Sequence, residues 1–148
     1  MNDHYNLKRF VDAQDAVFDA VLKELKAARK QTHWMWFIFP QLRGLGSSST
    51  AQFYGIGSLE EARAYLSDPL LGPRLILCTR TVLESQGRSL SQIFGSPDDL
   101  KFRSSMTLFE AATSENDCVF GMALDRFCAA ERDQRTLRLL SSRGAAYP

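Results

Sequence analysis

Hydrophobic side chains recur along this chain every three or four residues, which is the spacing of amphipathic helices. The clearest example covers residues 7–29, and its basic last turns complement the negative end of a helix dipole. The pattern predicts one long helix there, with an apolar face made by Phe10, Val11, Val17, Phe18, Val21, Leu22 and Leu25.

Short polar residues mark where further helices begin. Ser58 stands three residues before Glu61, which is the arrangement of a capping box. Ser96 precedes Pro97 and two acidic residues, a sequence typical of a helix start. With Ser89 and Asp133 as further caps, the predicted helices cover about residues 59–66, 74–85, 90–94, 97–112, 119–127 and 134–140.

A shorter helix is predicted between Thr32, as its cap, and Phe39, because Pro40 disfavours helical geometry in the residue before it. No segment alternates strictly between apolar and polar residues, although the sequence is compatible with one short hairpin within residues 37–53. The predicted fold class is all-α, a compact single domain of seven to nine mostly short helices over residues 1–148. Residues 1–5 and 141–148 are expected to be flexible ends.

The charge balance argues against large charged partners. The chain has 18 basic and 17 acidic side chains and a net charge of +1, so no overall field attracts nucleic acid or anionic lipid. Nucleic-acid binding through the basic stretches at residues 23–30 and 126–138 is a weaker alternative, because Glu24, Asp125, Glu131 and Asp133 are interspersed there.

The chain lacks the basic-then-apolar start of a signal peptide, and no window approaches ~18 uninterrupted apolar residues. We therefore expect a cytoplasmic protein that does not associate with a membrane. Cys78, Cys118 and Cys128 are odd in number and widely spaced, which favours free thiols over disulfides or a zinc site. No metal and no cofactor is predicted.

An aromatic segment followed by a glycine-serine loop is the best candidate for a binding site. The indoles offer flat surfaces for stacking, the loop amides suit an anion, and a histidine near neutral pH suits proton transfer. The loop lacks the Lys-Ser/Thr ending of a phosphate-binding P-loop, so an aromatic core beside a plain turn is the alternative. The candidate residues here are His33, Trp34, Trp36, Gln41, Gly44, Gly46, Ser47, Ser48 and Tyr54.

A second polar cluster lies on the helix predicted over residues 97–112, where Lys101 and Ser105 are one turn apart. A lysine can activate a serine nucleophile, but the familiar S-x-x-K order is absent. Ordinary helix polarity and contact with a ligand are the other interpretations. Asp98 and Asp99 are adjacent and splayed, which makes them a poor acid–base pair.

The chain resembles the domain-of-unknown-function 1810 family in segments that span nearly its whole length, at residues 33–46, 61–66, 71–75, 93–101 and 104–109. The resemblance implies a compact, mainly α-helical domain without an established activity or catalytic residue. Family members often carry the label calpastatin-like, which implies inhibition of a calcium-dependent cysteine protease. We reject this label, because inhibitory calpastatin segments are disordered until bound, whereas this composition specifies a folded globule.

The sequence therefore leads to two hypotheses and assigns no reaction. The first is a helical domain that binds a small anionic or phosphate-bearing ligand, such as a nucleotide, between residues 33–49 and the Lys101–Ser105 cluster. The second is a non-catalytic module that presents an aromatic patch to another protein or to a second copy of itself.

Overall fold

The computed structural model describes residues 3–115 and 118–144 and contains ten helices in these ranges, seven of them with at least seven residues. The prediction of an all-helical fold is confirmed. The helices are α1 (Lys8–Asp15), α2 (Phe18–Lys26), α3 (Met35–Ile38), α4 (Ser49–Tyr54), α5 (Leu59–Ser67), α6 (Leu71–Glu84), α7 (Leu90–Phe94), α8 (Asp98–Ala112), α9 (Val119–Phe127) and α10 (Gln134–Gly144).

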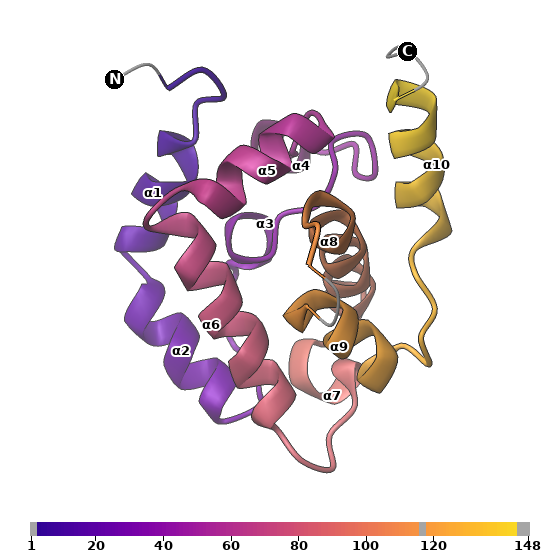
Figure 1. Cartoon of the computed structure of the whole chain (residues 1–148). Coiled ribbons are helices and arrows are strands. Elements are labelled where there is room, and N and C mark those ends of the chain that lie inside the picture. Colours follow the sequence, from indigo (N-terminus) through magenta and orange to yellow (C-terminus); the bar gives the residue numbers. More distant parts are fainter. Residues whose placement is uncertain (1–2, 116–117, 145–148) are drawn as a thin grey trace.

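The single long helix predicted over residues 7–29 is wrong, because the chain breaks after Asp15 into α1 and α2. Val17 leaves helical geometry with φ −130° and ψ −1°. The break lets the two pieces bury apolar residues against different neighbours, since α1 packs on α3 and α2 packs on α6. Figure 1 shows α1 and α2 along one flank of the molecule, with α10 on the opposite flank.

The segment between α2 and α5 is irregular and holds two short helices, α3 and α4. Thr32 does not cap α3, because its hydroxyl donates to Glu24 Oε2 at 2.7 Å. The hairpin considered within residues 37–53 does not form; Leu42 and Ile56 instead make an isolated parallel bridge. The Ile56 N–H donates to the Gln41 carbonyl at 2.9 Å, which fixes where Gln41 stands.

Several predicted caps are in place. Ser58 accepts from the Glu61 N–H, and Ser89 forms a full capping box with Gln92. Glu61 itself turns to the Gly57 N–H, so the box predicted at Ser58 is half formed. Ser96 is not the cap of α8, since Pro97 occupies that position without a side-chain hydrogen bond.

Helices α5 and α6 meet at a tight corner. Asp68 Oδ2 accepts from the N–H groups of both Leu70 and Leu71, which satisfies two free donors at the start of α6. The Gly72 N–H then donates to the Asp68 carbonyl at 3.2 Å. This corner directs α6 back across the core.

Aromatic side chains fill the centre of the molecule, where α8 packs against α5, α7, α9 and α10. Phe39, Phe94 and Phe102 contact one another with ring centroids 5.0–5.7 Å apart. All three are buried. Such edge-to-face and stacked contacts add stability beyond the area that the rings bury.

Asp133 caps α10, as predicted, because its Oδ2 accepts from the Thr136 N–H at 3.2 Å. The helix continues to Gly144, into the segment predicted as a flexible end, and residues 1–2 and 145–148 of the two predicted ends lie outside the described part. Within residues 3–115 and 118–144, no helix is long and apolar enough to cross a bilayer.

Candidate functional site

A small hollow opens beside α3, and we name it the Trp36 hollow after one of its aromatic walls. It is lined by Met35 and Trp36 of α3, Phe39 and Gln41 of the following loop, Ala51, Tyr54 and Gly55 at α4, and Lys101 of α8. Its volume is about 10 Å³, which is roughly the space of one water molecule. The structure thus brings together four of the predicted site residues, namely Trp36, Gln41, Tyr54 and Lys101.

Two lysines and one aspartate form a charged cluster at the rim of this hollow. Asp98 in the first turn of α8 pairs with Lys30 at 3.0 Å and with Lys101 at 3.5 Å. The Lys101 ammonium lies 4.9 Å from the centroid of the Trp36 ring, and the Lys30 ammonium lies 5.2 Å from that of Trp34. These three side chains carry a net charge of +1, and the Trp34 indole that Lys30 faces also donates to the Glu24 carboxylate.

Trp34 and Trp36 play different roles although they are two residues apart. Trp34 is fully buried, and its indole N–H donates to Glu24 Oε1 at 3.0 Å. Trp36 is half-buried and faces Lys101. Trp34 is therefore part of the core, whereas Trp36 is accessible to a ligand.

Glu24 on α2 organises the chain that leads to both indoles. Besides the Trp34 indole, it accepts from the Gln31 N–H at 2.7 Å and from the N–H and hydroxyl of Thr32 at 3.0 and 2.7 Å. Partial burial raises the pKa of this carboxyl, but the hydrogen bonds from Gln31, Thr32 and Trp34 outweigh it and lower the pKa to about 2. Glu24 is therefore charged at neutral pH and holds residues 31–34 in place.

The glycine-serine loop uses part of its hydrogen-bonding capacity to begin α4. Ser48 caps α4 by accepting from the Ala51 N–H at 3.1 Å, and its carbonyl accepts from the Gln52 N–H at 3.0 Å. The Ser47 carbonyl accepts from the Gln52 side chain. The Ala51 and Gln52 amides of α4 are therefore already used, by the hydroxyl and the carbonyl of Ser48.

The remaining predicted residues do not line the hollow. His33 is exposed in the turn before α3. Gly46 lies under α4, where a Cβ would come within 2.8 Å of the Ala51 Cβ, and Gly44 adopts φ +109° under the guanidinium of Arg143. These glycines permit close packing of the loop, which is a structural use of the residue.

Ser105 does not meet the Lys101 ammonium. Its side chain has 0% exposure, and its Oγ has no hydrogen-bond partner among the described residues. The neighbouring hydroxyls of Ser104 and Thr107, in contrast, donate to the carbonyls one turn before them. The structure therefore shows no lysine-activated serine in residues 3–115 and 118–144.

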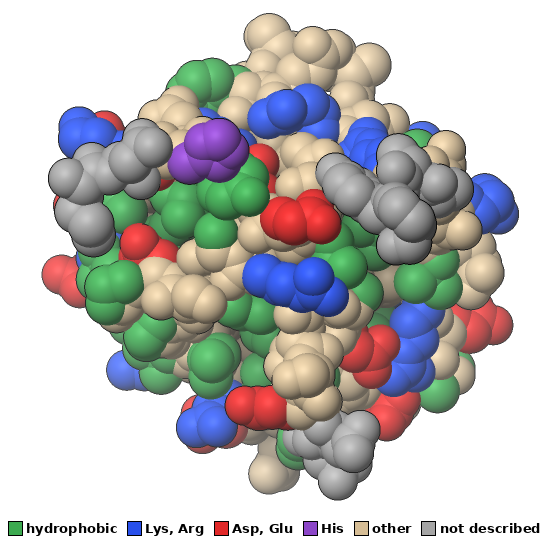
Figure 2. Space-filling view, turned by 45° about the horizontal axis from the view of Figure 1, so that its top comes forward, with side chains coloured by type: hydrophobic (Ala, Val, Ile, Leu, Met, Phe, Trp, Pro, Cys, Tyr) green, Lys and Arg blue, Asp and Glu red, His purple; other side chains and the backbone are tan. Residues whose placement is uncertain are grey.

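Two arginines of the second basic stretch named as a nucleic-acid alternative, Arg126 and Arg132, are engaged within the fold. Arg126 donates to the carbonyls of Leu83 and Ser85. Arg132 donates to Glu110 at 2.9 and 2.6 Å and to Asp125 at 3.0 Å, and these contacts raise its pKa above the ordinary value. Figure 2 likewise shows basic and acidic side chains interspersed over the face that it presents.

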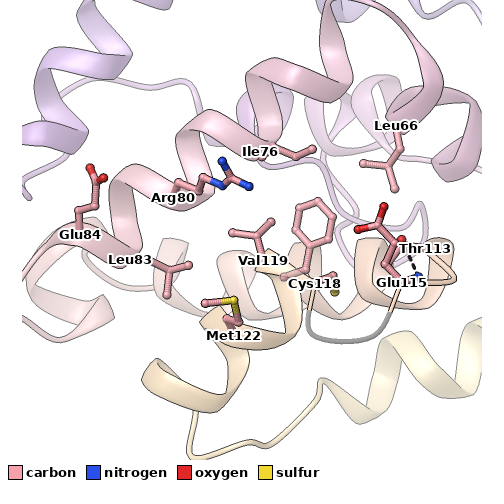
Figure 3. A pocket seen from close by; sticks show the side chains of 11 residues that line it. Leu66, Ile76, Arg80, Leu83, Glu84, Thr113, Glu115, Cys118, Val119 and Met122 are labelled. Atoms are coloured by element: carbon pink, nitrogen blue, oxygen red, sulfur yellow. Dashed lines mark hydrogen bonds between the residues drawn. The ribbon is translucent and has the colours of Figure 1, made fainter.

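A larger groove of about 550 Å³ lies between α6 and α9. Figure 3 shows Ile76 and Leu83 of α6 opposite Val119 and Met122 of α9, with Arg80 between the two helices. The walls are mainly apolar, and the polar groups stand at the ends as Glu84, Thr113 and Glu115. The charged residues that line the groove are one arginine and two glutamates, Arg80, Glu84 and Glu115.

Sequence reasoning missed the pairing of Lys30 with Asp98 and the groove. The sequence explained Lys30 as a cation at a helix end and Asp98 as an acid at a helix start. Neither interpretation required the other residue, so the ion pair between them was not predicted. The groove has no sequence signal, because its residues follow the same helical periodicity as the core.

The described residues form an all-helical protein with a small hollow lined by aromatic side chains and Lys101. The chain belongs to the family described as "Protein of unknown function (DUF1810)", whose model matches residues 4–140, and the resemblance seen in the sequence is confirmed. It is similar to the conserved hypothetical protein Rv1873 from Mycobacterium tuberculosis, with 57% identity over 94% of this chain and 99% of that one and a TM-score of 0.92. No curated protein matches the chain.

Proposed function

We propose that this protein binds a small anionic ligand at the Trp36 hollow, with the anionic group beside Lys101. The observation that carries the proposal is the sharing of one carboxylate, Asp98, by two ammonium groups. Two partly buried ammonium groups that share one carboxylate gain free energy when an anion joins them.

The walls of the hollow suggest what the rest of the ligand is like. Trp36 and Tyr54 offer aromatic faces, and the Gln41 amide can both donate and accept. A sugar or base attached to a phosphate fits this combination, as in a nucleotide. Because the hollow has room for about one water, the bulk of such a ligand rests at its mouth, over the partly exposed Trp36 and Lys101.

A thermal-shift screen against inorganic phosphate, nucleotides and ADP-ribose at low ionic strength tests the proposal. A ligand at about 100 times its Kd raises the free energy of unfolding by roughly 2.7 kcal/mol, which corresponds to several degrees in Tm for a domain of this size. We expect such a shift in the wild type and a loss of at least about fivefold in affinity in Lys101→Gln, since the variant lacks the ammonium.

Lys26→Gln is the matched control. Lys26 is an exposed lysine at the end of α2 that does not line the hollow, and its substitution removes the same charge. Its affinity should equal that of the wild type. A flat screen with a stable wild type would contradict the proposal, and equal weakening by both variants would reduce it to nonspecific charge attraction.

The second candidate function is a protein-interaction module. Phe53 favours it, because this ring is 52% exposed and stacks edge-to-face on Tyr54, which lines the hollow. Concentration-dependent association that Phe53→Ser abolishes would support this function, and a strictly monomeric protein that binds a phosphate compound would favour the ligand.

A further inference from the structure

The Asp98 carboxylate divides its two oxygens unequally between the lysines. Oδ2 lies 3.0 Å from Lys30, whose side chain is 7% exposed, whereas Oδ1 lies 3.5 Å from Lys101, whose side chain is 26% exposed. The contact with Lys30 is therefore the tighter and more sheltered one. The contact with Lys101 is the looser one and lies nearer to solvent, where a ligand arrives.

We infer that Asp98 sets the charge selectivity of the Trp36 hollow, as a built-in competitor for Lys101 that favours phosphate dianions over carboxylates and other monoanions. The inference rests on the proposed function, because it specifies which anions that site accepts. Asp98 is then a specificity-determining residue. It contacts Lys101, which binds the anion, and does not contact the ligand itself.

Elementary electrostatics gives the reason. An anion that approaches Lys101 is attracted by the ammonium and repelled by the nearby Asp98 carboxylate. A monoanion offers the lysine no more charge than the carboxylate contact that it displaces, so little free energy is gained. A dianion doubles both the attraction to Lys101 and the repulsion from Asp98, but the free energy needed to open the Lys101–Asp98 contact stays the same, so a net gain remains. Selectivity of this kind arises from a repulsive element placed against the wrong ligand.

The adjacent residue, Asp99, separates this role from a simple helix effect. Both acids lie in the first turn of α8, so both interact favourably with the positive end of the helix. Asp99 Oδ1, however, accepts the Leu100 N–H at 2.9 Å, and its carboxylate forms no ion pair with Lys30 or Lys101. Asp99→Asn therefore makes the same charge change without removing the competitor.

The experiment compares wild type, Asp98→Asn and Asp99→Asn in titrations with inorganic phosphate and with acetate at about pH 8, where phosphate is mainly a dianion. Binding is followed by NMR shifts of the indole N–H signals at constant ionic strength. We expect the wild type to prefer phosphate, and Asp98→Asn to bind acetate about tenfold more tightly than the wild type does. Asp99→Asn should behave as the wild type.

A second variant guards against misfolding, because Asp98→Asn leaves Lys30 buried without its partner. Lys30→Met combined with Asp98→Asn removes the inner pair together, keeps the net charge of the chain and still removes the competitor for Lys101. It should show the same gain in acetate affinity. Agreement between the two variants excludes both a net-charge effect and a folding defect.

The experiment distinguishes failure of this inference from failure of the proposed function. If the wild type binds phosphate but neither variant gains acetate affinity, or if Asp99→Asn gains as much as Asp98→Asn, the selectivity role of Asp98 is wrong and the anion site stands. If phosphate, nucleotides and acetate leave the indole signals unchanged in wild type and in both Asp98 variants, the proposed function itself is wrong.

Discussion

At the scale of single residues, Glu24 connects α2 to the segment that precedes α3. Its carboxylate accepts four hydrogen bonds from residues 31–34 and so fixes the approach to α3. A carboxylate that is hydrogen-bonded in the folded state, and free in the unfolded state, couples folding to pH.

The direction of that coupling follows from the pKa. Because the folded pKa falls from the ordinary 4.5 to about 2, Glu24 stabilises the fold fully above about pH 4.5, and the contribution disappears as pH falls through 2. We expect Glu24→Gln to be less stable than the wild type near neutral pH, with a difference that shrinks between about pH 4.5 and 2. Urea unfolding at a series of pH values measures this difference.

The exposed Glu60 of α5 supplies a control for that series. Glu60→Gln should track the wild type over the acid range to within a few tenths of a kcal/mol. A difference between Glu24→Gln and wild type that stays constant with pH would contradict the assigned role.

The two tryptophans show which features of the site could be predicted from the sequence and which could not. The residues Trp36, Gln41, Tyr54 and Lys101 were recognisable as chemistry-bearing types, and they do meet in the hollow. The buried role of Trp34 was not recognisable, because it depends on Glu24 from another helix. Local pattern identifies which side chains can act, and tertiary packing decides which of them face solvent.

At the scale of helices, capping residues were the most informative signals. Ser58, Ser89 and Asp133 begin helices because their side chains satisfy free N–H groups locally. The break between α1 and α2 had no such signal, since the apolar spacing continues through it. What favours the break is the separate packing of α1 on α3 and α2 on α6, which is a long-range property.

Asp133 allows a prediction about a whole helix. It is buried, and its Oδ2 also accepts from the Ser104 hydroxyl at 3.0 Å, which ties the start of α10 to α8. Asp133→Ala should cost about 1–2 kcal/mol from the lost cap and increase hydrogen exchange of the α10 amides most. Gln134→Ala, at the exposed next position, is the control. Uniform acceleration across all helices would instead indicate that α10 has no independent opening.

At the scale of the whole molecule, Arg9 joins distant segments. Its guanidinium pairs with Glu61 at 2.8 Å, with side chains 5% and 6% exposed. It also donates to the carbonyls of Tyr5, Asn6, Phe53 and Gly55. All five N–H groups of the guanidinium thus have an acceptor, which is how a buried charge is tolerated.

Removing one partner of this pair should be severe. We expect Arg9→Met to lower the free energy of unfolding by about 3–5 kcal/mol, because it strands the Glu61 carboxylate in the interior. Lys8→Met, next to it in an exposed pair with Asp12, should cost at most about 0.5 kcal/mol. Urea midpoints give both values. If Arg9→Met combined with Glu61→Met is no more stable than Arg9→Met alone, the stranded charge is not the source of the loss.

The corner between α5 and α6 has a consequence for the family's history. A Cβ atom at Gly72 would lie 2.1 Å from the carbonyl oxygen of Leu66, so every other amino acid would force the two helices apart. A lineage that lost this glycine would have to rebuild the core around α6 at the same time. Across related genes, we therefore expect purifying selection to hold this codon even where the residues of the hollow have diverged.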